Sequence, residues 1–245
     1  MMIKIAHLYY DLMNLYGDNG NLKALKYQLD HQGIKSKIEF LTIGDNIDFS
    51  KYDFIYMGPG TDYNQKLVLK DIMKYKNNIK EAIDNNTFFL ITGNALDLFG
   101  KYILDENGRK TNTLNLFDFY SKNESFRLVD EVIAKTPLLS NYVLGFQNQG
   151  STMHNLDNPL FEMIKGIGAY PNSNIEGINY KNFYGTYFIG PILVRNPELL
   201  KLITKKLLLH KDNNFKFKRF NLLLEQQAHD EYIRNRYDFT TDKKA

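Results

Sequence analysis

A nearly continuous apolar run at 87–91 constrains the fold more than any other stretch of the chain. A strand this apolar suits the middle of a parallel sheet, where helices cover both faces. The next residues, 92–95, read Thr-Gly-Asn-Ala and predict a tight turn into a helix. Many α/β enzymes hold their nucleophile on such an elbow, where backbone N–H groups of the turn receive an oxyanion. We therefore expect a site at the carboxyl end of this strand.

Strand and helix patterns alternate through the first half of the chain. Besides 87–91, strands are predicted at 3–9, 37–41 and 52–57. Apolar residues at helical spacing predict helices at 22–33 and 64–83. This alternation is typical of a three-layer α/β fold, in which a mostly parallel sheet has flanking helices, as in flavodoxin.

The second half of the chain changes character. Shorter strands, separated by Asn, Gly and Pro turns, are predicted at 114–120, 126–135, 142–146, 175–180 and 184–188. We expect them to add antiparallel strands at one edge of the sheet. A strongly apolar helix is then predicted at 198–209.

We divide the chain into a domain over 1–210 and an appendage over 211–245. The appendage consists of a linker, an amphipathic helix from Phe220 to about Arg236, and a charged tail from Asp238 that we expect to be disordered. This helix has more apolar surface than a solvated helix needs, at Leu222, Leu223, Leu224 and Tyr232. We expect part of that surface to pack on the domain and the remainder to form an interface.

The chain contains no cysteine, which excludes disulfides, cysteine-based zinc sites and thiolate catalysis. We find no phosphate-binding loop, dinucleotide fingerprint or metal-ligand spacing, and therefore expect no cofactor and no metal. The net charge of +3 comes mostly from scattered lysines, which favours a solvated surface over nucleic-acid binding. We also find no signal-peptide pattern or long apolar run, and expect a cytoplasmic protein without membrane insertion.

Three loops follow predicted strands at the carboxyl edge of the sheet, where ligands bind in folds of this kind. They are the loop after the first strand, the loop Gly58–Asp62 and the elbow at 92–95. Glycines at 58 and 60 would let backbone amides approach a ligand closely, as an oxyanion hole or an anion nest requires. A tight strand-to-helix turn without any ligand needs the same residues, so both interpretations stay open at this point.

Four segments resemble, in order, motifs of the cobyric acid synthase-like class I glutamine amidotransferases. They are HLYYDLMNLYGDNGN at 7–21, GPGTDYNQ at 58–65, GFQNQG at 145–150 and GTYFIGPILVRNP at 185–197. Within this family the chain looks most like the glutaminase subunits that act beside a Mur-ligase-like synthetase. The resemblance runs from about Met2 to about Leu209 and implies the family's fold. It also implies a pocket with an oxyanion-like cradle, at Gly58, Gly60, Asn94, Asn148 and Gln149.

The same resemblance shows where catalytic residues are missing. The family's elbow typically begins with the nucleophilic cysteine, and counting back from Gly100 places Gly93 at that position. One inserted residue would place Thr92 there instead. The family's catalytic histidine, typically in Gly-Thr-Tyr-Leu-His-Gly-Pro, falls on Ile189, which has no ionisable group. Two of the three positions of the catalytic triad therefore lack their catalytic residue.

A hydroxyl nucleophile at Thr92 would need an adjacent base, because the pKa of a hydroxyl lies far above neutrality. Four of the five histidines have plain structural explanations, in packing, at helix ends or on a solvated helix face: His7, His31, His210 and His229. We expect His229 to be solvated. His154 follows Gln149 and Gly150 in a predicted loop and is the surrogate base that we would test.

We therefore expect a degenerate amidotransferase that no longer hydrolyses glutamine but still docks on a synthetase. The resemblance implies that this partner is a Mur-ligase-like (MurT-like), ATP-dependent synthetase subunit, in the amidation of peptidoglycan precursors. Two alternatives remain open. The chain is an active glutaminase with altered catalytic residues, or it is a sensor that binds a glutamine-like amino acid or amide in the old pocket.

Overall fold

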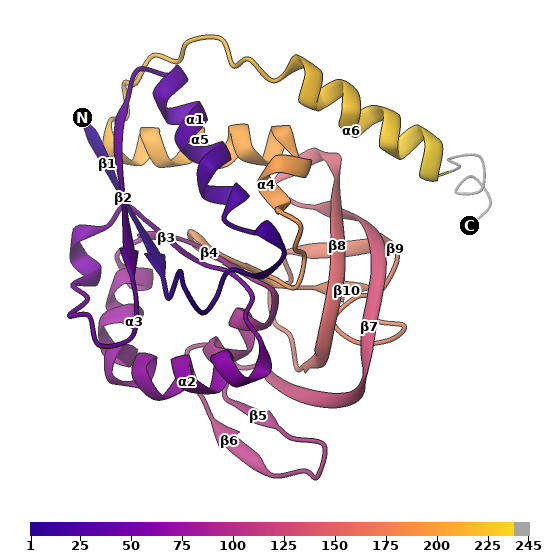
Figure 1. Ribbon diagram of the computed structural model, residues 1–245. Helices are drawn as coiled ribbons and strands as arrows, with labels where there is room; N and C mark the ends of the chain where they lie inside the picture. The colour runs from indigo at the N-terminus through magenta and orange to yellow at the C-terminus, as the bar shows by residue number, and fades with distance from the viewer. Residues whose placement is uncertain (238–245) are drawn as a thin grey trace.

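The computed structural model describes residues 1–237 and contains two six-stranded sheets (Figure 1). The first sheet has the strand order β11-β12-β4-β3-β1-β2. Its strands are β1 Met2–Leu8, β2 Lys35–Leu41, β3 Phe54–Met57, β4 Phe88–Thr92, β11 Ile178–Tyr180 and β12 Phe183–Thr186. Neighbouring strands are parallel except β11 and β12, which pair antiparallel at one edge. The entirely buried strands β3 and β4 lie in the middle, as the apolar run of β4 predicts.

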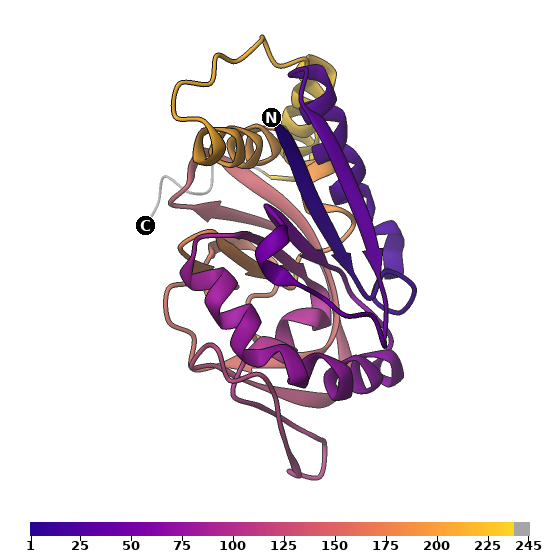
Figure 2. The ribbon, with the colours of Figure 1, turned by 90° about the vertical axis from the view of Figure 1, so that its left-hand side faces the viewer.

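Helices cover both faces of this sheet, as the two perpendicular views show (Figures 1 and 2), and the expected α/β class is confirmed. They are α1 Gly20–His31, α4 Ile192–Arg195 and α5 Pro197–Lys211 on one face, and α2 Asp62–Ile72 and α3 Lys76–Asp84 on the other. Each face has its own apolar core. Leu25 packs in the core that contains Ile5, and Val68 packs in the core that contains Ile55.

Of the strands in the second half, β11 and β12 extend the first sheet, and β11 is the expected antiparallel strand at its edge. The other strands form a separate sheet, so the expectation that they also extend the first sheet is wrong. This sheet has the order β10-β9-β7-β5-β6, and β8 pairs with β7. Its strands are β5 Tyr102–Leu104, β6 Lys110–Asn112, β7 Tyr120–Thr136, β8 Leu139–His154, β9 Phe161–Lys165 and β10 Ile175–Glu176. At 17 and 16 residues, β7 and β8 are much longer than predicted and pair with each other, which leaves neither to extend the parallel sheet.

Two predictions of single elements are also wrong. The helix expected over 64–83 is two helices, because a 3₁₀ turn at Met73–Tyr75 separates α2 from α3. The strand expected over 114–120 is irregular until β7 begins. Its backbone packs on the elbow rather than on a strand, since the N–H of Leu114 donates to the carbonyl of Leu98 at 2.9 Å.

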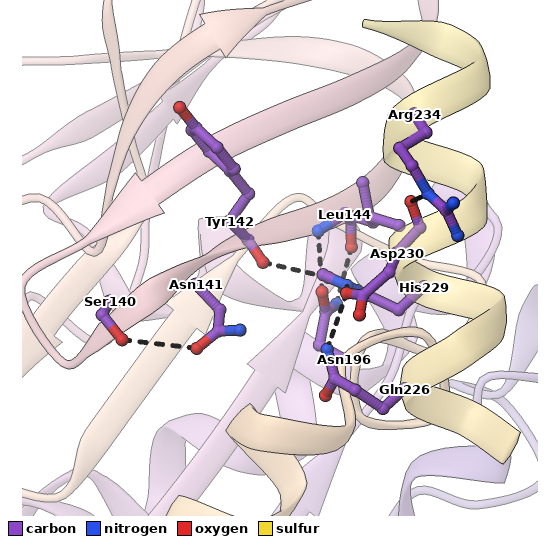
Figure 3. A network of polar contacts seen from close by, with 9 residues as sticks. All are labelled: Ser140, Asn141, Tyr142, Leu144, Asn196, Gln226, His229, Asp230 and Arg234. Carbon is purple, nitrogen blue, oxygen red and sulfur yellow. Dashed lines mark hydrogen bonds and ion pairs between the residues drawn. The ribbon is translucent and has the colours of Figure 1, made fainter. Parts of the chain in front are cut away.

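The last helix, α6 Leu223–Arg236, lies against β8 and is joined to it by polar contacts (Figure 3). Nε2 of His229 donates to the carbonyl of Tyr142 at 3.0 Å. His229 is only 5% exposed, so the expectation that it is solvated is wrong. Below it, the side chain of Asn196 bonds both the N–H and the carbonyl of Leu144, each at 2.7 Å.

The apolar residues of α6 and of the turn before it divide into two groups. Leu222 and Ile233 are buried against the domain, whereas Leu223 and Leu224 are 66% and 76% exposed. This division matches the expectation that only part of the surface packs on the domain. The charged tail predicted from Asp238 lies outside the described residues.

The segment between α5 and α6 follows the surface of the domain. The boundary predicted after residue 210 falls in the last turn of α5. Farther along, Oε1 of Gln32 accepts from the N–H of Lys218 at 2.8 Å, which fixes the segment beside α1. Over the described part of the chain, no helix is long and apolar enough to span a membrane.

Candidate functional site

A cavity of about 540 Å³ lies where the loops after β3 and β4 meet the second sheet. The tip of the β5–β6 hairpin, which projects from the body in Figure 2, forms part of its wall. Among the residues predicted from the sequence, those that line the cavity are Gly60, Gly93, Asn94, Asn148, Gln149 and Ile189. Gly58 and Thr92 are buried outside it. A Cβ at Gly58 would lie 2.6 Å from the Tyr56 hydroxyl, so this glycine serves packing within the chain.

Gly93 stands at the apex of the elbow, where β4 ends and the 3₁₀ helix Gly93–Phe99 begins. Its φ of +59° lies in the left-handed region that residues with a side chain avoid. A Cβ there would come 2.6 Å from Cβ of Pro59 and 3.2 Å from Cγ2 of Ile189. The strained apex is where elbow enzymes hold their nucleophile. The backbone therefore favours Gly93 over Thr92 for that position.

Thr92 is buried and its hydroxyl is already bonded. It donates to the carboxylate of Asp18, which also accepts from the Tyr56 hydroxyl at 2.6 Å and the Gly190 N–H at 3.1 Å. Burial raises the pKa of Asp18, and these hydrogen bonds act in the opposite direction. Within residues 1–237, no histidine is hydrogen-bonded to Thr92. Thr92 thus has neither a histidine base nor a face on the cavity.

Ile189 lies beside the elbow, at the end of the loop that follows β12. It is buried, and its N–H donates to the carbonyl of Phe146 at 2.9 Å, which joins this loop to β8. Its side chain borders the Cβ position of Gly93. The structure thus brings together Gly93 and Ile189, the two positions at which the sequence resemblance predicts the nucleophile and the base, and neither residue has an ionisable side chain.

Asn94 bonds Gly60 across the elbow. The Gly60 N–H donates to Oδ1 of Asn94, and Nδ2 of Asn94 donates to the Gly60 carbonyl, both at 2.9 Å. Nε2 of Gln65 donates to the backbone carbonyl of Asn94 at 2.6 Å. The Gly60 N–H that we expected to receive an oxyanion is already paired within the chain, which departs from the sequence-based expectation.

Asp97 is a buried acid in the 3₁₀ helix of the elbow, and the sequence alone assigns it no role. Its carboxylate accepts from Ser121 (2.6 Å), Ser151 (2.9 Å), Tyr187 (2.5 Å) and Gln65 (3.1 Å). Burial raises the pKa of Asp97, while these donors lower it. In the sequence, Asp97 is an acidic residue among the apolar residues of the elbow helix. The sequence does not show which residues bond it.

Glu176 is a second buried acid that sequence reasoning missed. It accepts from the Tyr187 N–H at 2.6 Å and from the Thr186 hydroxyl at 2.7 Å. Burial raises the pKa of Glu176 to about 7. These bonds hold the start of the loop that carries Ile189 toward the elbow.

Asn148 and Gln149 line the same wall but have different environments. Arg127 donates from Nε to Oδ1 of Asn148 and from Nη2 to its carbonyl, both at 2.8 Å. Gln149 is 3% exposed, and its Oε1 accepts from Gln147 at 3.3 Å. Nε2 of Gln149 has no hydrogen-bond partner among the described residues. A buried donor of this kind on a cavity wall favours an acceptor from water or a ligand.

His154, the proposed surrogate base, lies outside the cavity. Its ring stacks between Tyr120 and Tyr170, with centroids 5.2 Å from each, and its Nε2 is 2.9 Å from Oγ1 of Thr152. Burial lowers the pKa of His154. Burial also lowers the pKa of His7, in β1, to about 4. In the part of the chain that the structure describes, no group of three or more His, Cys, Asp or Glu side chains is placed to hold a metal ion.

Comparisons with known proteins identify the family. Residues 4–197 match the CobB/CobQ-like glutamine amidotransferase domain. The chain is 31% identical to the lipid II isoglutaminyl synthase (glutamine-hydrolyzing) subunit GatD of Streptococcus pneumoniae, over 97% of this chain and 94% of that protein. It is 30% identical to GatD of Staphylococcus aureus, over 92% and 93% of the two chains.

A solved structure shows the same fold at much lower sequence identity. A glutamine amidotransferase from Thermotoga maritima superposes with a TM-score of 0.52 at 10% identity, covering 95% of this chain and 92% of that one. The sequence resemblance to the family is thus confirmed over most of the chain, including the elbow at which the cysteine is missing. The chain belongs to the CobB/CobQ-like glutamine amidotransferase family.

Proposed function

We propose that this chain is a non-hydrolytic subunit of a Mur-ligase-like, ATP-dependent amide synthetase that amidates peptidoglycan precursors. The observation that supports the proposal is the elbow, where Ile189 packs against Gly93 and neither residue offers a nucleophile or a base. Hydrolysis through a covalent intermediate needs a nucleophile and an adjacent base. With neither in place, the role left to the chain is to bind the synthetase, which takes free ammonia or no longer needs it.

The relatives support the choice of partner. Both GatD proteins are described as glutamine-hydrolysing subunits of lipid II isoglutaminyl synthase, so each acts within a larger synthase. The similarity covers 94% and 93% of the two relatives, which supports a role as a subunit like theirs. Because the partner consumes ATP, we place the complex in the cytoplasm.

The test measures glutamate release and complex formation on the same samples. The purified chain, alone and co-expressed with the Mur-ligase-like synthetase of its own genome, is incubated with glutamine. We expect glutamate at the buffer background in both samples and a complex that survives size-exclusion chromatography. Turnover that Thr92→Ala or His154→Ala abolishes would show an active glutaminase. A chain that elutes apart from the synthetase would contradict the docking role.

The exposed leucines of α6 give the docking proposal a local test. Leu223 and Leu224 expose apolar area that the domain does not cover, and apolar area of this kind stabilises an interface. We expect Leu223→Asp with Leu224→Asp to weaken the complex at least tenfold, as measured by isothermal titration calorimetry. The control is Met73→Asp, at an exposed apolar residue on the opposite face of the first sheet, where we expect no change.

A second candidate function is a sensor that binds a small amino acid or amide without turning it over. The observation that favours it is Nε2 of Gln149, which has no partner among the described residues, on the wall of the 540 Å³ cavity that Arg127 also lines. These donors fit a carboxylate or carbonyl oxygen. Thermal unfolding of the chain with and without L-glutamate tests this candidate. A stabilisation that Gln149→Leu removes would favour the sensor, and an unchanged melting temperature would count against it.

A further inference from the structure

The carboxamide of Asn94 lies where the elbow meets the loop after β3, on the wall of the cavity. It bonds one backbone residue at two points, because its oxygen accepts from the Gly60 N–H while its nitrogen donates to the Gly60 carbonyl. A ligand with a primary carboxamide would pair with the same backbone group in the same way. The side-chain amide of Asn94 therefore occupies the backbone N–H and carbonyl of Gly60 that the amide of a ligand would bond.

Both sides of this pair are fixed by further hydrogen bonds. On the elbow side, Nε2 of Gln65 bonds the Asn94 carbonyl at 2.6 Å and the buried carboxylate of Asp97 at 3.1 Å. On the loop side, a Cβ at Gly60 would lie 2.8 Å from the carbonyl of Leu12, so the loop is packed against the chain behind it. A small movement of the elbow or of the loop therefore does not free the Gly60 N–H. A ligand that bonds this N–H must break its hydrogen bond to Asn94.

We propose that Asn94 is an internal ligand of the elbow and determines which molecules the cavity accepts. Its carboxamide occupies the backbone donor that the carbonyl oxygen of a glutamine-like ligand needs, so the isolated chain excludes such ligands from the elbow. The proposal rests on the proposed function in one respect, since both concern glutamine as the molecule that this site no longer serves. Beyond the proposed function, this proposal names Asn94 as the residue that excludes glutamine.

The experiment compares L-glutamine binding by the wild-type chain and by Asn94→Ala, followed by NMR on the isotope-labelled protein. We expect no saturable shift of the Gly60 amide signal in the wild type and a saturable shift in the variant. Without glutamine, the Gly60 amide of Asn94→Ala should exchange with solvent about tenfold faster, because one hydrogen bond has been lost. Asn123→Ala, at another asparagine of the cavity wall, is the matched control and should behave like the wild type.

Three results would overturn the proposal. They are glutamine binding by the wild type as tight as by the variant, unchanged exchange at Gly60, and a folded Asn94→Ala that binds no glutamine. Asn94→Ser gives a second measurement if the alanine variant does not fold, because its side chain is too short to span the pair. No synthetase and no turnover enter the comparison. Glutamate release by the wild type would refute the proposed function and the exclusion of glutamine together, whereas saturable glutamine binding by the wild type without glutamate release would refute the exclusion alone.

Discussion

At the scale of single residues, a glycine can be required in a turn because it adopts a positive φ or because no Cβ fits, and both reasons apply to Gly93. Its positive φ costs any other residue about 1 to 2 kcal/mol. Its missing Cβ leaves room for Pro59 and Ile189. Gly108, in the β5–β6 hairpin, also has a positive φ, of +76°, but no described heavy atom lies within 4 Å of its Cβ position. A side chain at Gly108 would therefore meet only the strain of a positive φ, whereas a side chain at Gly93 would meet that strain and steric overlap.

We expect Gly93→Ala to lower the free energy of unfolding by about 2 to 4 kcal/mol, because strain and overpacking add. Gly108→Ala should lower it by about 1 kcal/mol, from conformation alone. Urea denaturation followed by circular dichroism measures both. Equal losses of stability in the two variants would mean that Pro59 and Ile189 move aside to accommodate a side chain at position 93 at no cost.

Glu176 makes stability depend on pH in an unusual direction. The pKa of this buried carboxyl is about 7, against an ordinary value of 4.5, so the folded state holds an extra proton between these two values. The free energy of unfolding therefore falls as pH rises from about 4.5 to about 7. The fall amounts to roughly 3 kcal/mol for this one group, at about 1.4 kcal/mol per pH unit.

Glu176→Gln should remove this fall, because glutamine stays neutral over the whole range. The measurement is the free energy of unfolding of both proteins at intervals from pH 4.5 to 8, with the difference between them growing in favour of the variant as pH rises. Glu81→Gln, at an exposed position of α3, serves as the control and should leave the profile as it is in the wild type. Parallel profiles for Glu176→Gln and wild type would contradict the argument.

At the scale of elements, β8 shows how a strand edge is closed without another strand. Its carbonyl at Phe146 accepts from the N–H of Ile189. The N–H and carbonyl of Leu144 bond the side chain of Asn196, and the carbonyl of Tyr142 accepts from His229 (Figure 3). These contacts fall on alternate residues along one edge of the strand. Open edges invite pairing with other chains. Side chains from α6 and from the turn before α5 thus protect β8 from association.

Asn196→Ala should leave the buried N–H and carbonyl of Leu144 without partners and lower the free energy of unfolding by about 2 to 3 kcal/mol. It should also promote self-association, detected by light scattering. Asn141→Ala, in the same strand, loses only a 3.4 Å contact with Ser140 and should change stability by less than about 0.5 kcal/mol. A monomeric Asn196→Ala of wild-type stability would show that water replaces the side chain.

At the scale of the whole molecule, Asp97 joins parts that are distant in the chain. Its partners belong to α2, to β7 and β8 of the second sheet, and to the loop after β12 of the first sheet. This buried carboxylate therefore links the second sheet to the first and connects two walls of the cavity.

We expect Asp97→Ala to lower the free energy of unfolding by roughly 3 to 5 kcal/mol, because several buried donors lose their acceptor together. Asp97→Asn keeps one acceptor oxygen and should lose only about half as much. Hydrogen exchange should show amides of both sheets becoming less protected in Asp97→Ala. Loss of protection confined to the elbow would mean that the sheets are held together by other contacts.

The features that the sequence predicts depend on residues close together in the chain, and the features that it misses depend on residues far apart in the chain. The central position of β4 was predicted because its apolar run reports burial locally. The second sheet was missed because the pairing of β7 with β8 depends on contacts that no local period records, and the burial of β7 alternates irregularly. Asp97 was missed for the same reason, since its partners lie 24 to 90 residues away in the sequence.

The crowding around Gly93 also bears on how such a site changes over generations. A cysteine introduced at this position would meet Pro59 at 2.6 Å and Ile189 at 3.2 Å before it could react. Both neighbours would have to move first, and neither movement restores any chemistry by itself. In the present backbone, a single substitution at position 93 therefore would not create a working nucleophile.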